Sequence, residues 1–491
     1  MKNYFSFNSA QLLIMVKNYS LVLNIVLKKV LPKETDELRL KNWAKKALEQ
    51  AKVLGKEYNA IPILAGSITR DTWLPGKFEF DIFVQFPETF PEKQFESAGL
   101  QIGKKLITKL GGKFEIRYAQ HPYVSGKVDG IQIDVVPCYH VGSPEKMRSA
   151  VDRTPFHVKY IEENINKTLS NEVRLLKQFC LANDIYGADT KTEGFSGYVC
   201  ELMVIKYKNF LNVLKNCLSW RPGEVLDLKN FYKKEDYGKL RKQFKNHPLI
   251  LIDPTDKERN TCAALSPKNF FKLKKLATDF LLKPNESFFF GKKLQPLTEN
   301  ELMINQKKRI TEIILIVFRP PKIVPDILWP QLRRFGERLQ SILEESRNEF
   351  KVLGRDVYSN EKEIAVVLLE MEVSKLPKVQ KRIGPSVFDL NDSANFLKKY
   401  SKDLIAGPYI ENSNWVVEVE RKFLSAREKL KDSLKRKSET LKEKGIPNFI
   451  AEEISKKFEI VSENRDIMKM IRTNERFGDF LRKYFEKESL A

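Results

Sequence analysis

The sequence predicts a multidomain α+β protein, and three observations support this fold class. Its 491 residues suffice for roughly two to four domains of about 150 residues each. Hydrophobic residues make up 42% of the chain, so it can bury sizeable cores and is not disordered. Strand and helix patterns mix near the N-terminus, helical patterns dominate the middle, and a β-α-β-β order follows in the C-terminal third.

Residues 1–150 are predicted to form a mixed-sheet domain preceded by helices. Pro32 separates a first short helix from a second one over 36–54, because proline cannot continue a helix. An amphipathic pattern predicts a further helix over 92–110. Strand patterns cover 61–65, 78–86, 113–118 and 130–136.

The remaining chain is predicted as three parts. Residues 151–290 are mostly helical, for example over 171–182 and 198–217. Residues 291–420 carry the α+β pattern, with strands over 313–318, 350–357 and 363–370 and a helix over 328–345. Residues 421–491 are expected to form a charged helical extension. Lys and Arg crowd its segment 429–444, and such a run is more often a solvated helical face than a binding arm.

Charge and cysteine usage restrict the function classes. The chain has 86 Lys+Arg against 64 Asp+Glu, a net charge of +22, which favours a polyanionic partner such as nucleic acid; a basic protein from a lysine-rich proteome is the alternative. Five scattered cysteines exclude a disulfide framework and a CxxC zinc site, so we expect a reduced, cytoplasmic protein. The apolar run 11–16 stops at Lys17, far short of a membrane span.

A Gly-Ser pair follows the first predicted strand. Gly66 permits a tight turn, and Ser67 is expected to begin a short helix that ends at Pro75-Gly76. Unpaired N–H groups at a helix N-terminus bind phosphates, and Arg70 in the first turn can reach the same phosphates. Alone, such a turn is usually only a capping feature.

Three carboxylates complete the pattern. Glu79 and Asp81 share one face of a predicted strand, and Asp134 has the corresponding place on another. If these strands are neighbours, the carboxylates meet at one sheet end and repel one another unless cations neutralise them. Oxygen-only ligands suit Mg²⁺. A Glu-x-Asp pair alone is usually an ordinary strand edge; its combination with Gly66-Ser67 upstream and Asp134 downstream is specific.

Gly66-Ser67, Glu79-x-Asp81 and Asp134 together resemble the nucleotidyltransferase superfamily. More specific motifs, in collinear order over about residues 18 to 420, resemble those of the archaeal-type (class I) CCA-adding tRNA nucleotidyltransferases. The motifs are Gly66-Ser-x-x-Arg70, Tyr118-Ala-x-His121-Pro-Tyr123, Asp134-Val-Val-Pro-Cys-Tyr139, Arg153-Thr-Pro155, Glu172-Val-Arg-Leu-Leu-Lys177, Ile185-Tyr-Gly187, Gly194-Phe-Ser-Gly-Tyr198, Asp253-Pro-x-Asp256 with Arg259-Asn260, and Gly384-Pro-x-Val-Phe388.

The resemblance implies roles for individual residues. Glu79, Asp81 and Asp134 would be catalytic and ligate two Mg²⁺ ions. Gly66, Ser67 and Arg70 would hold the triphosphate of CTP or ATP, while Arg259, with the RNA end, would read the base edge. The other residues expected at the nucleotide are Thr154, His157, Lys177 and Tyr186. Outside this context, Lys177 would be a surface lysine and His157 a core or loop histidine.

The resemblance also implies the reaction. Untemplated transfer would add C, C and A to the 3′ end of tRNA from CTP and ATP, with release of pyrophosphate. An N-terminal nucleotidyltransferase domain, a helical nucleotide-recognition domain and C-terminal tRNA-binding parts would recognise the tRNA upper half by shape and phosphates. Two alternatives are open: a related RNA nucleotidyltransferase of partial CC-, A-adding or poly(A) type, and a catalytically silent RNA-binding protein. The sequence leaves the oligomeric state open, including a homodimer.

Overall fold

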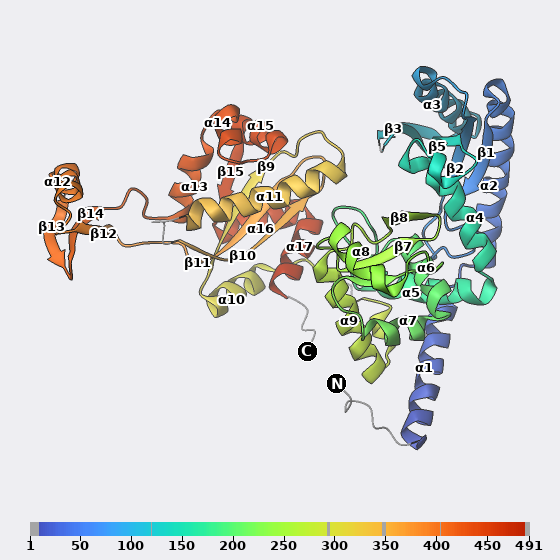
Figure 1. Ribbon diagram of the computed structural model, residues 1–491, viewed down its shortest axis with the longest axis horizontal. Helices are drawn as coiled ribbons and strands as arrows, with labels where there is room; N and C mark the ends of the chain where they lie inside the picture. The colour runs from blue at the N-terminus through green and yellow to red at the C-terminus, as the bar shows by residue number, and fades with distance from the viewer. Residues whose placement is uncertain (1–8, 119, 292–294, 346–349, 403, 487–491) are drawn as a thin grey trace. The chain divides into compact units, whose positions relative to one another are not determined.

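The computed structural model describes residues 9–118, 120–291, 295–345, 350–402 and 404–486 (Figure 1). The chain forms two compact units, one up to residue 292 and one from residue 293 onward, and each is described by itself. Both units mix helices and sheets, as the sequence predicts. Among the described residues, no helix is long and apolar enough to cross a membrane.

The first unit contains a five-stranded sheet in the order β1-β2-β5-β4-β3. Strands β2 and β5 are parallel, and the other neighbours are antiparallel. Helices α2 (Glu34–Gly55) and α3 (Glu92–Lys109) bury their apolar faces against one side of it. The strands are β1 (Ile61–Ala65), β2 (Glu79–Pro87), β3 (Lys113–Tyr118), β4 (Pro122–Val128) and β5 (Ile131–His140).

The helix expected to begin at Ser67 is absent, and this prediction is wrong. The chain after Gly66 makes turns in which the Thr72 N–H donates to the Ser67 carbonyl at 3.0 Å, and Asp71 takes a left-handed φ of 51°. The consecutive side chains of Thr72, Trp73 and Leu74 are all buried, 0%, 2% and 3% exposed. The left-handed residue Asp71 cannot continue a right-handed helix, so the chain turns there and places all three side chains in the interior.

The middle of the first unit is mostly helical. Helices α1 (Ser9–Val30), α4 (Thr154–Asn164), α5 (Lys167–Ala182), α6 (Gly197–Tyr207), α7 (Phe210–Cys217), α8 (Tyr237–Gln243) and α9 (Pro267–Leu282) accompany a small sheet of β6 (Glu224–Leu226), β7 (Leu249–Asp253) and β8 (Asp256–Asn260). The helix predicted over 198–217 is two helices, because Lys208 has a φ of 74° and the Asn209 side chain caps α7.

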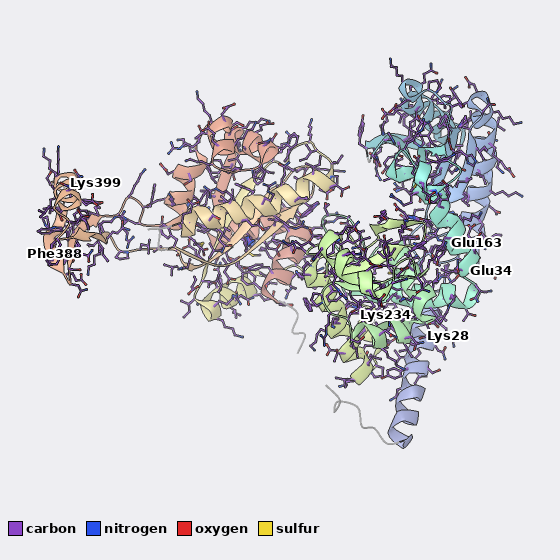
Figure 2. All side chains as sticks on the ribbon, in the orientation of Figure 1. Lys28, Glu34, Glu163, Lys234, Phe388 and Lys399 are labelled. Carbon is purple, nitrogen blue, oxygen red and sulfur yellow. The ribbon has the colours of Figure 1, made fainter. Side chains whose placement is uncertain are left out.

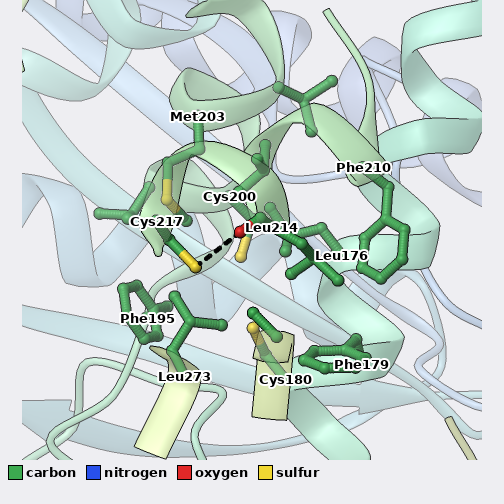
Figure 3. Packing of buried hydrophobic residues seen from close by; sticks show 14 of the residues in the cluster. Leu176, Phe179, Cys180, Phe195, Cys200, Met203, Phe210, Leu214, Cys217 and Leu273 are labelled. Atoms are coloured by element: carbon green, nitrogen blue, oxygen red, sulfur yellow. Dashed lines mark hydrogen bonds between the residues drawn. The ribbon is translucent and has the colours of Figure 1, made fainter. Parts of the chain in front are cut away.

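Aromatic, aliphatic and sulfur-containing side chains fill the core of this helical part (Figure 3). The five cysteines of the chain are free and buried, four of them in this core. Cys217 donates to the Leu214 carbonyl at 3.1 Å, so its thiol is used within its own helix. Burial raises the pKa of the Cys217 thiol to about 12. These thiols therefore act as small apolar groups.

The second unit is built on an antiparallel sheet in the order β10-β11-β9-β15. One face packs on α11 (Pro325–Glu344), α13 (Ala426–Leu434) and α15 (Asn448–Lys456), and the other on α10 (Glu299–Arg309), α16 (Asn464–Thr473) and α17 (Glu475–Phe485). The strands are β9 (Glu312–Phe318), β10 (Lys351–Ser359), β11 (Ala365–Val373) and β15 (Phe458–Val461).

Residues after 421, expected as a charged helical extension, contribute to both cores. Leu430, Leu434 and Ile450 are buried on one face of the sheet, and Phe477 and Leu481 on the other. The segment also supplies β15, which pairs with β9. Apolar residues at helical spacing thus bury one stripe of each helix while the charges face outward.

A separate three-stranded sheet lies within the second unit. It consists of β12 (Val379–Ser386), β14 (Asn414–Glu420) and β13 (Leu404–Glu411), with helix α12 (Leu390–Lys399) beside β12. The side chains of Phe388 and Lys399, labelled in Figure 2, belong to this part, and Phe388 is 85% exposed.

Candidate active site

The three carboxylates predicted to converge lie on neighbouring strands. In the parallel pair β2 and β5, Asp81 stands directly beside Asp134, and Glu79 beside Gln132. The alternate side chains Phe80 and Ile133 are 1% and 0% exposed in the core beneath α2 and α3. The carboxylates therefore occupy the opposite face of the sheet.

Asp81 lies in an environment that is unfavourable for a negative charge. Burial, Asp134 and Glu79 together raise the pKa of its carboxyl to about 7, against a smaller lowering effect of Arg70. Asp134 is oriented by neighbours: its Oδ1 accepts hydrogen bonds from Ser125 Oγ at 2.7 Å and Gln132 Nε2 at 3.1 Å. The negative charge on the carboxylate face of the sheet is therefore only partly neutralised by nearby cations.

The donor set fits Mg²⁺. In the parts of the chain that the structure describes, no three His, Cys, Asp or Glu side chains form a ready-made metal cage. Mg²⁺ does not need one, since it binds through one or two carboxylates and completes its shell with substrate phosphates and water. A bound cation would also relieve the repulsion that Asp134 and Glu79 exert on Asp81.

A cavity of about 470 Å³ joins the carboxylates to the helical part of the unit. It is lined by eight of the eleven residues singled out from the sequence, namely Gly66, Ser67, Arg70, Glu79, Asp81, Asp134, Lys177 and Tyr186. Four further polar residues line it that the sequence analysis did not select as site residues: Arg117, Gln132, Tyr198 and Glu201.

Glu201 is the centre of a buried ion network beside this cavity. Its carboxylate is 0% exposed and accepts hydrogen bonds from Lys177 Nζ at 3.1 Å and Thr72 Oγ1 at 2.6 Å. Arg70 Nε faces its second oxygen at 3.2 Å. Burial alone would raise the pKa of Glu201, but Lys177 and Arg70 lower it to about 2, so the group is a carboxylate at neutral pH.

Lys177 is not the surface lysine that its sequence context allows. It is 2% exposed, and its ammonium donates to Glu201, to Thr72 Oγ1 at 3.0 Å and to the Thr72 carbonyl at 3.3 Å. One carboxylate thus serves two cations, which leaves the network with a net positive charge next to the cavity. Positive charge held in place before the substrate arrives favours a polyphosphate.

Thr154, His157 and Arg259 do not line the cavity, and His157 and Arg259 both contact a second acid, Asp253. Asp253 Oδ2 accepts from His157 Nε2 at 2.8 Å and Arg259 Nη1 at 2.7 Å. Thr154 begins α4, one turn before His157. Burial lowers the pKa of His157; burial would raise that of Asp253, but its hydrogen bonds to His157 and Thr255 hold it well below its ordinary value.

Tyr198 connects the two groups. Its ring lines the cavity and stacks on the His157 ring with centroids 4.0 Å apart, and its hydroxyl donates to Asp253 Oδ1 at 3.2 Å. Next to it, Gly197 leaves room that a side chain would fill: a Cβ there would lie 3.1 Å from the Tyr186 hydroxyl and 3.4 Å from Lys177 Nζ. The Gly-Tyr pair therefore lets α6 begin against the cavity.

Three family models match consecutive parts of this chain. They are "Nucleotidyltransferase domain" at residues 44–157, "tRNA nucleotidyltransferase, second domain" at 171–290, and "CCA-adding enzyme, C-terminal domain" at 309–463. Among solved structures, one described as a cytoplasmic RNA terminal U-transferase aligns over 57% of this chain and 100% of its own, at 13% identity and a TM-score of 0.44, a likeness too low to add to the assignment.

Curated relatives match over most of their length. The CCA-adding enzyme of Archaeoglobus fulgidus is 36% identical over 90% of this chain and 94% of its own, and that of Methanosarcina mazei 34% identical over 94% and 97%. The CCA-adding enzyme of Methanosarcina barkeri is 36% identical over 83% and 88%. The chain therefore belongs to the CCA-adding enzymes, a family of tRNA nucleotidyltransferases.

Proposed function

We propose that the cavity above β2 and β5 is the active site in which this enzyme adds C, C and A to the 3′ end of tRNA from CTP and ATP. The observation that carries this assignment is the direct pairing of Asp81 with Asp134, with Glu79 on the same face. Glu79, Asp81 and Asp134 would hold two Mg²⁺ ions. Bound Mg²⁺ lowers the pKa of an attacking hydroxyl and offsets charge on a triphosphate.

The residues around the carboxylates would position the nucleotide. Gly66 and Ser67 offer the turn after β1, and Arg70 offers a guanidinium beside the cavity. Lys177 donates its hydrogens to Thr72 and Glu201, so its contribution to a triphosphate is its charge. Tyr186 lines the same cavity, and Lys77 Nζ lies over its ring, 4.7 Å from the ring centroid.

Base selection would fall to the cluster around Asp253. Arg259 keeps 36% of its side chain exposed while Asp253 fixes its orientation, so donors remain available to a base edge. His157 is held by the same carboxylate, and Thr154 lies one turn away. Oriented donors discriminate well between bases, because a wrong partner leaves buried polar groups unpaired.

The experiment offers labelled CTP, ATP, UTP and GTP to a tRNA that lacks its last three nucleotides. Incorporation of C and A only, with Mg²⁺ present, supports the proposal. Continued addition of A would instead indicate a poly(A)-type polymerase. Tight tRNA binding without incorporation would indicate the catalytically silent alternative.

A basic groove in the second unit is proposed to bind the tRNA backbone. A hollow of about 1,410 Å³ lies between α13, α14 (Ser438–Glu443), α15, β15 and α16. Eight Lys and Arg side chains line it, against Glu459 and Asp466: Arg427, Lys431, Lys435, Arg436, Lys437, Lys456, Lys457 and Lys469. Such a surface fits the phosphates of an RNA helix, whose shape rather than base sequence is recognised.

Replacing Lys431, Lys435 and Lys437 together by Gln should raise the tRNA KM about tenfold at physiological salt. Each lost phosphate contact lowers the slope of log K against log salt by about 0.9. The three side chains are exposed, so the fold should be retained. Deleting the chain after Arg421 is not a valid test, because it would remove residues of both cores.

The matched control replaces Lys45, Lys52 and Lys56 by Gln, exposed lysines on and just after α2, which covers the sheet face opposite the carboxylates. Kinetics at 50 to 200 mM salt compare both triple variants. A salt slope that falls equally in both would show a general charge effect and contradict a specific groove.

A further inference from the structure

The edge strand β3 carries a cation that the proposed function does not use. All six residues of Lys113–Tyr118 are exposed. Glu115 pairs with Ser125 of β4, which pairs with Asp134 of β5, so Lys113, Glu115 and Arg117 share the face of the carboxylates. Of these three, Arg117 lines the active-site cavity.

Arg117 and Arg70 reach the carboxylates from opposite sides. In the strand order β1-β2-β5-β4-β3, the carboxylates lie on the second and third strands, β2 and β5. Ser67 and Arg70 follow β1 on one side of them, and Arg117 lies on β3 on the other. The cavity therefore has one cationic wall beside Glu201 and a second at the open edge of the sheet.

The chemistry of nucleotidyl transfer gives these two sides different tasks. The RNA 3′-oxygen forms a bond to the α-phosphorus, the bond from that phosphorus to the oxygen bridging to the β-phosphate breaks, pyrophosphate leaves, and the hydroxyl proton passes to solvent. Attack and departure are in line, on opposite faces of the phosphorus. If the triphosphate lies toward Arg70 and Lys177, the RNA end must approach from the side of β4 and β3.

The ion pair between Arg117 and Glu115 is weak enough for Arg117 to bind a phosphate instead. Arg117 Nη2 lies 2.6 Å from Glu115 Oε1, with the two side chains 45% and 64% exposed. An exposed ion pair contributes only about 0–1 kcal/mol, so an RNA phosphate can join or replace Glu115 at little energetic cost. The planar guanidinium matches a phosphate with two parallel hydrogen bonds.

We propose that Arg117 binds the phosphodiester backbone of the RNA 3′ end, and that the exposed edge of β3 is the subsite for the primer terminus. This inference rests on the proposed function of the cavity, because it assigns the nucleotide to the opposite wall. It also accounts for an exposed edge strand beside an active site: an extended RNA end needs open backbone and side-chain surface.

The test compares Arg117→Gln with Lys113→Gln. Lys113 lies four residues away on the same strand face, about 13 Å along β3, and does not line the cavity. The substrate is a tRNA without its last three nucleotides, and KM is measured separately for tRNA and CTP. Arg117→Gln should raise the tRNA KM about tenfold and reduce the salt slope of binding by roughly 0.7–1, while the CTP KM changes less than about twofold.

Arg117→Lys should recover the salt slope but only part of the affinity, because the charge is kept and the bidentate pairing is lost, and Lys113→Gln should behave as wild type. The proposal is overturned if Arg117→Gln raises the CTP KM instead, or if both Gln variants lower tRNA affinity equally. Direct binding of labelled tRNA without nucleotide gives the same comparison. A wild type that binds but incorporates nothing contradicts the proposed function, whereas the binding difference between the two variants still decides the role of Arg117.

Discussion

Asp81→Asn is expected to lower incorporation of CTP and ATP by about a thousandfold or more, while the protein becomes more stable at pH 8 in the absence of divalent ions. Loss of a ligand removes several kcal/mol of metal-based transition-state stabilisation. The stability effect follows from the pKa of Asp81, about 7 in the fold against an ordinary value of 3.8. The folded state holds this proton more tightly than the unfolded state, so stability falls as pH rises from about 4 to 7.

Asparagine has nearly the same shape and no charge, so the variant escapes this penalty. Thermal unfolding in EDTA should therefore give a higher Tm for Asp81→Asn than for wild type at pH 8, and nearly equal values at pH 4. Glu49→Gln is the control, since Glu49 is exposed on α2. A variant that is less stable than wild type at pH 8, or that keeps its activity, would contradict the assignment of Asp81.

Glu201→Gln is expected to destabilise the protein by about 3–5 kcal/mol and to lower kcat/KM for both CTP and ATP. The change leaves the buried ammonium of Lys177 without its counter-charge, which is the costly way to break a buried ion pair. Arg70 loses the same partner beside the cavity. Chemical denaturation and steady-state kinetics measure the two effects.

The double variant Lys177→Met/Glu201→Gln separates stability from function. Removing both charges should restore part of the lost stability, because the buried ammonium is gone and only Arg70 is left without its counter-charge. Activity should stay low, since a cation next to the triphosphate is also gone. The pKa of Glu201, about 2 against 4.5, adds a pH signature: its stabilising effect is present above pH 4.5 and is lost as pH falls toward 2. A double variant with wild-type kinetics would contradict a role for this network in nucleotide binding.

The period-two pattern of strands made the carboxylate arrangement predictable. Glu79 and Asp81 had to share a face, and apolar neighbours at Phe80 and Ile133 fixed which face was buried. The path after Gly66 was not predictable in this way. A start signal at Ser67 and a stop signal at Pro75-Gly76 suggested a helix there, whereas the observed turns depend on tertiary burial of Thr72, Trp73 and Leu74.

Strand β4 and the buried Glu201 are two further features that local sequence patterns did not predict. Strand β4 was missed because Ser125, Gly126 and Lys127 have low strand propensity, although its register orients Asp134. Glu201 was missed because its partners Lys177, Arg70 and Thr72 come from distant segments. Its one local signal was a single acid in the buried helix α6, where an ionised side chain needs partners.

The most direct test of the account is the sequence of the product end. Wild type is incubated with Mg²⁺, CTP, ATP and a tRNA that lacks its last three nucleotides, in parallel with Asp81→Asn and Glu49→Gln, and the tRNA 3′ ends are sequenced. We expect C, C, A and then no further residue with wild type and Glu49→Gln, and an unextended tRNA with Asp81→Asn. Any other added sequence, or extension by Asp81→Asn, would contradict the proposed active site and reaction.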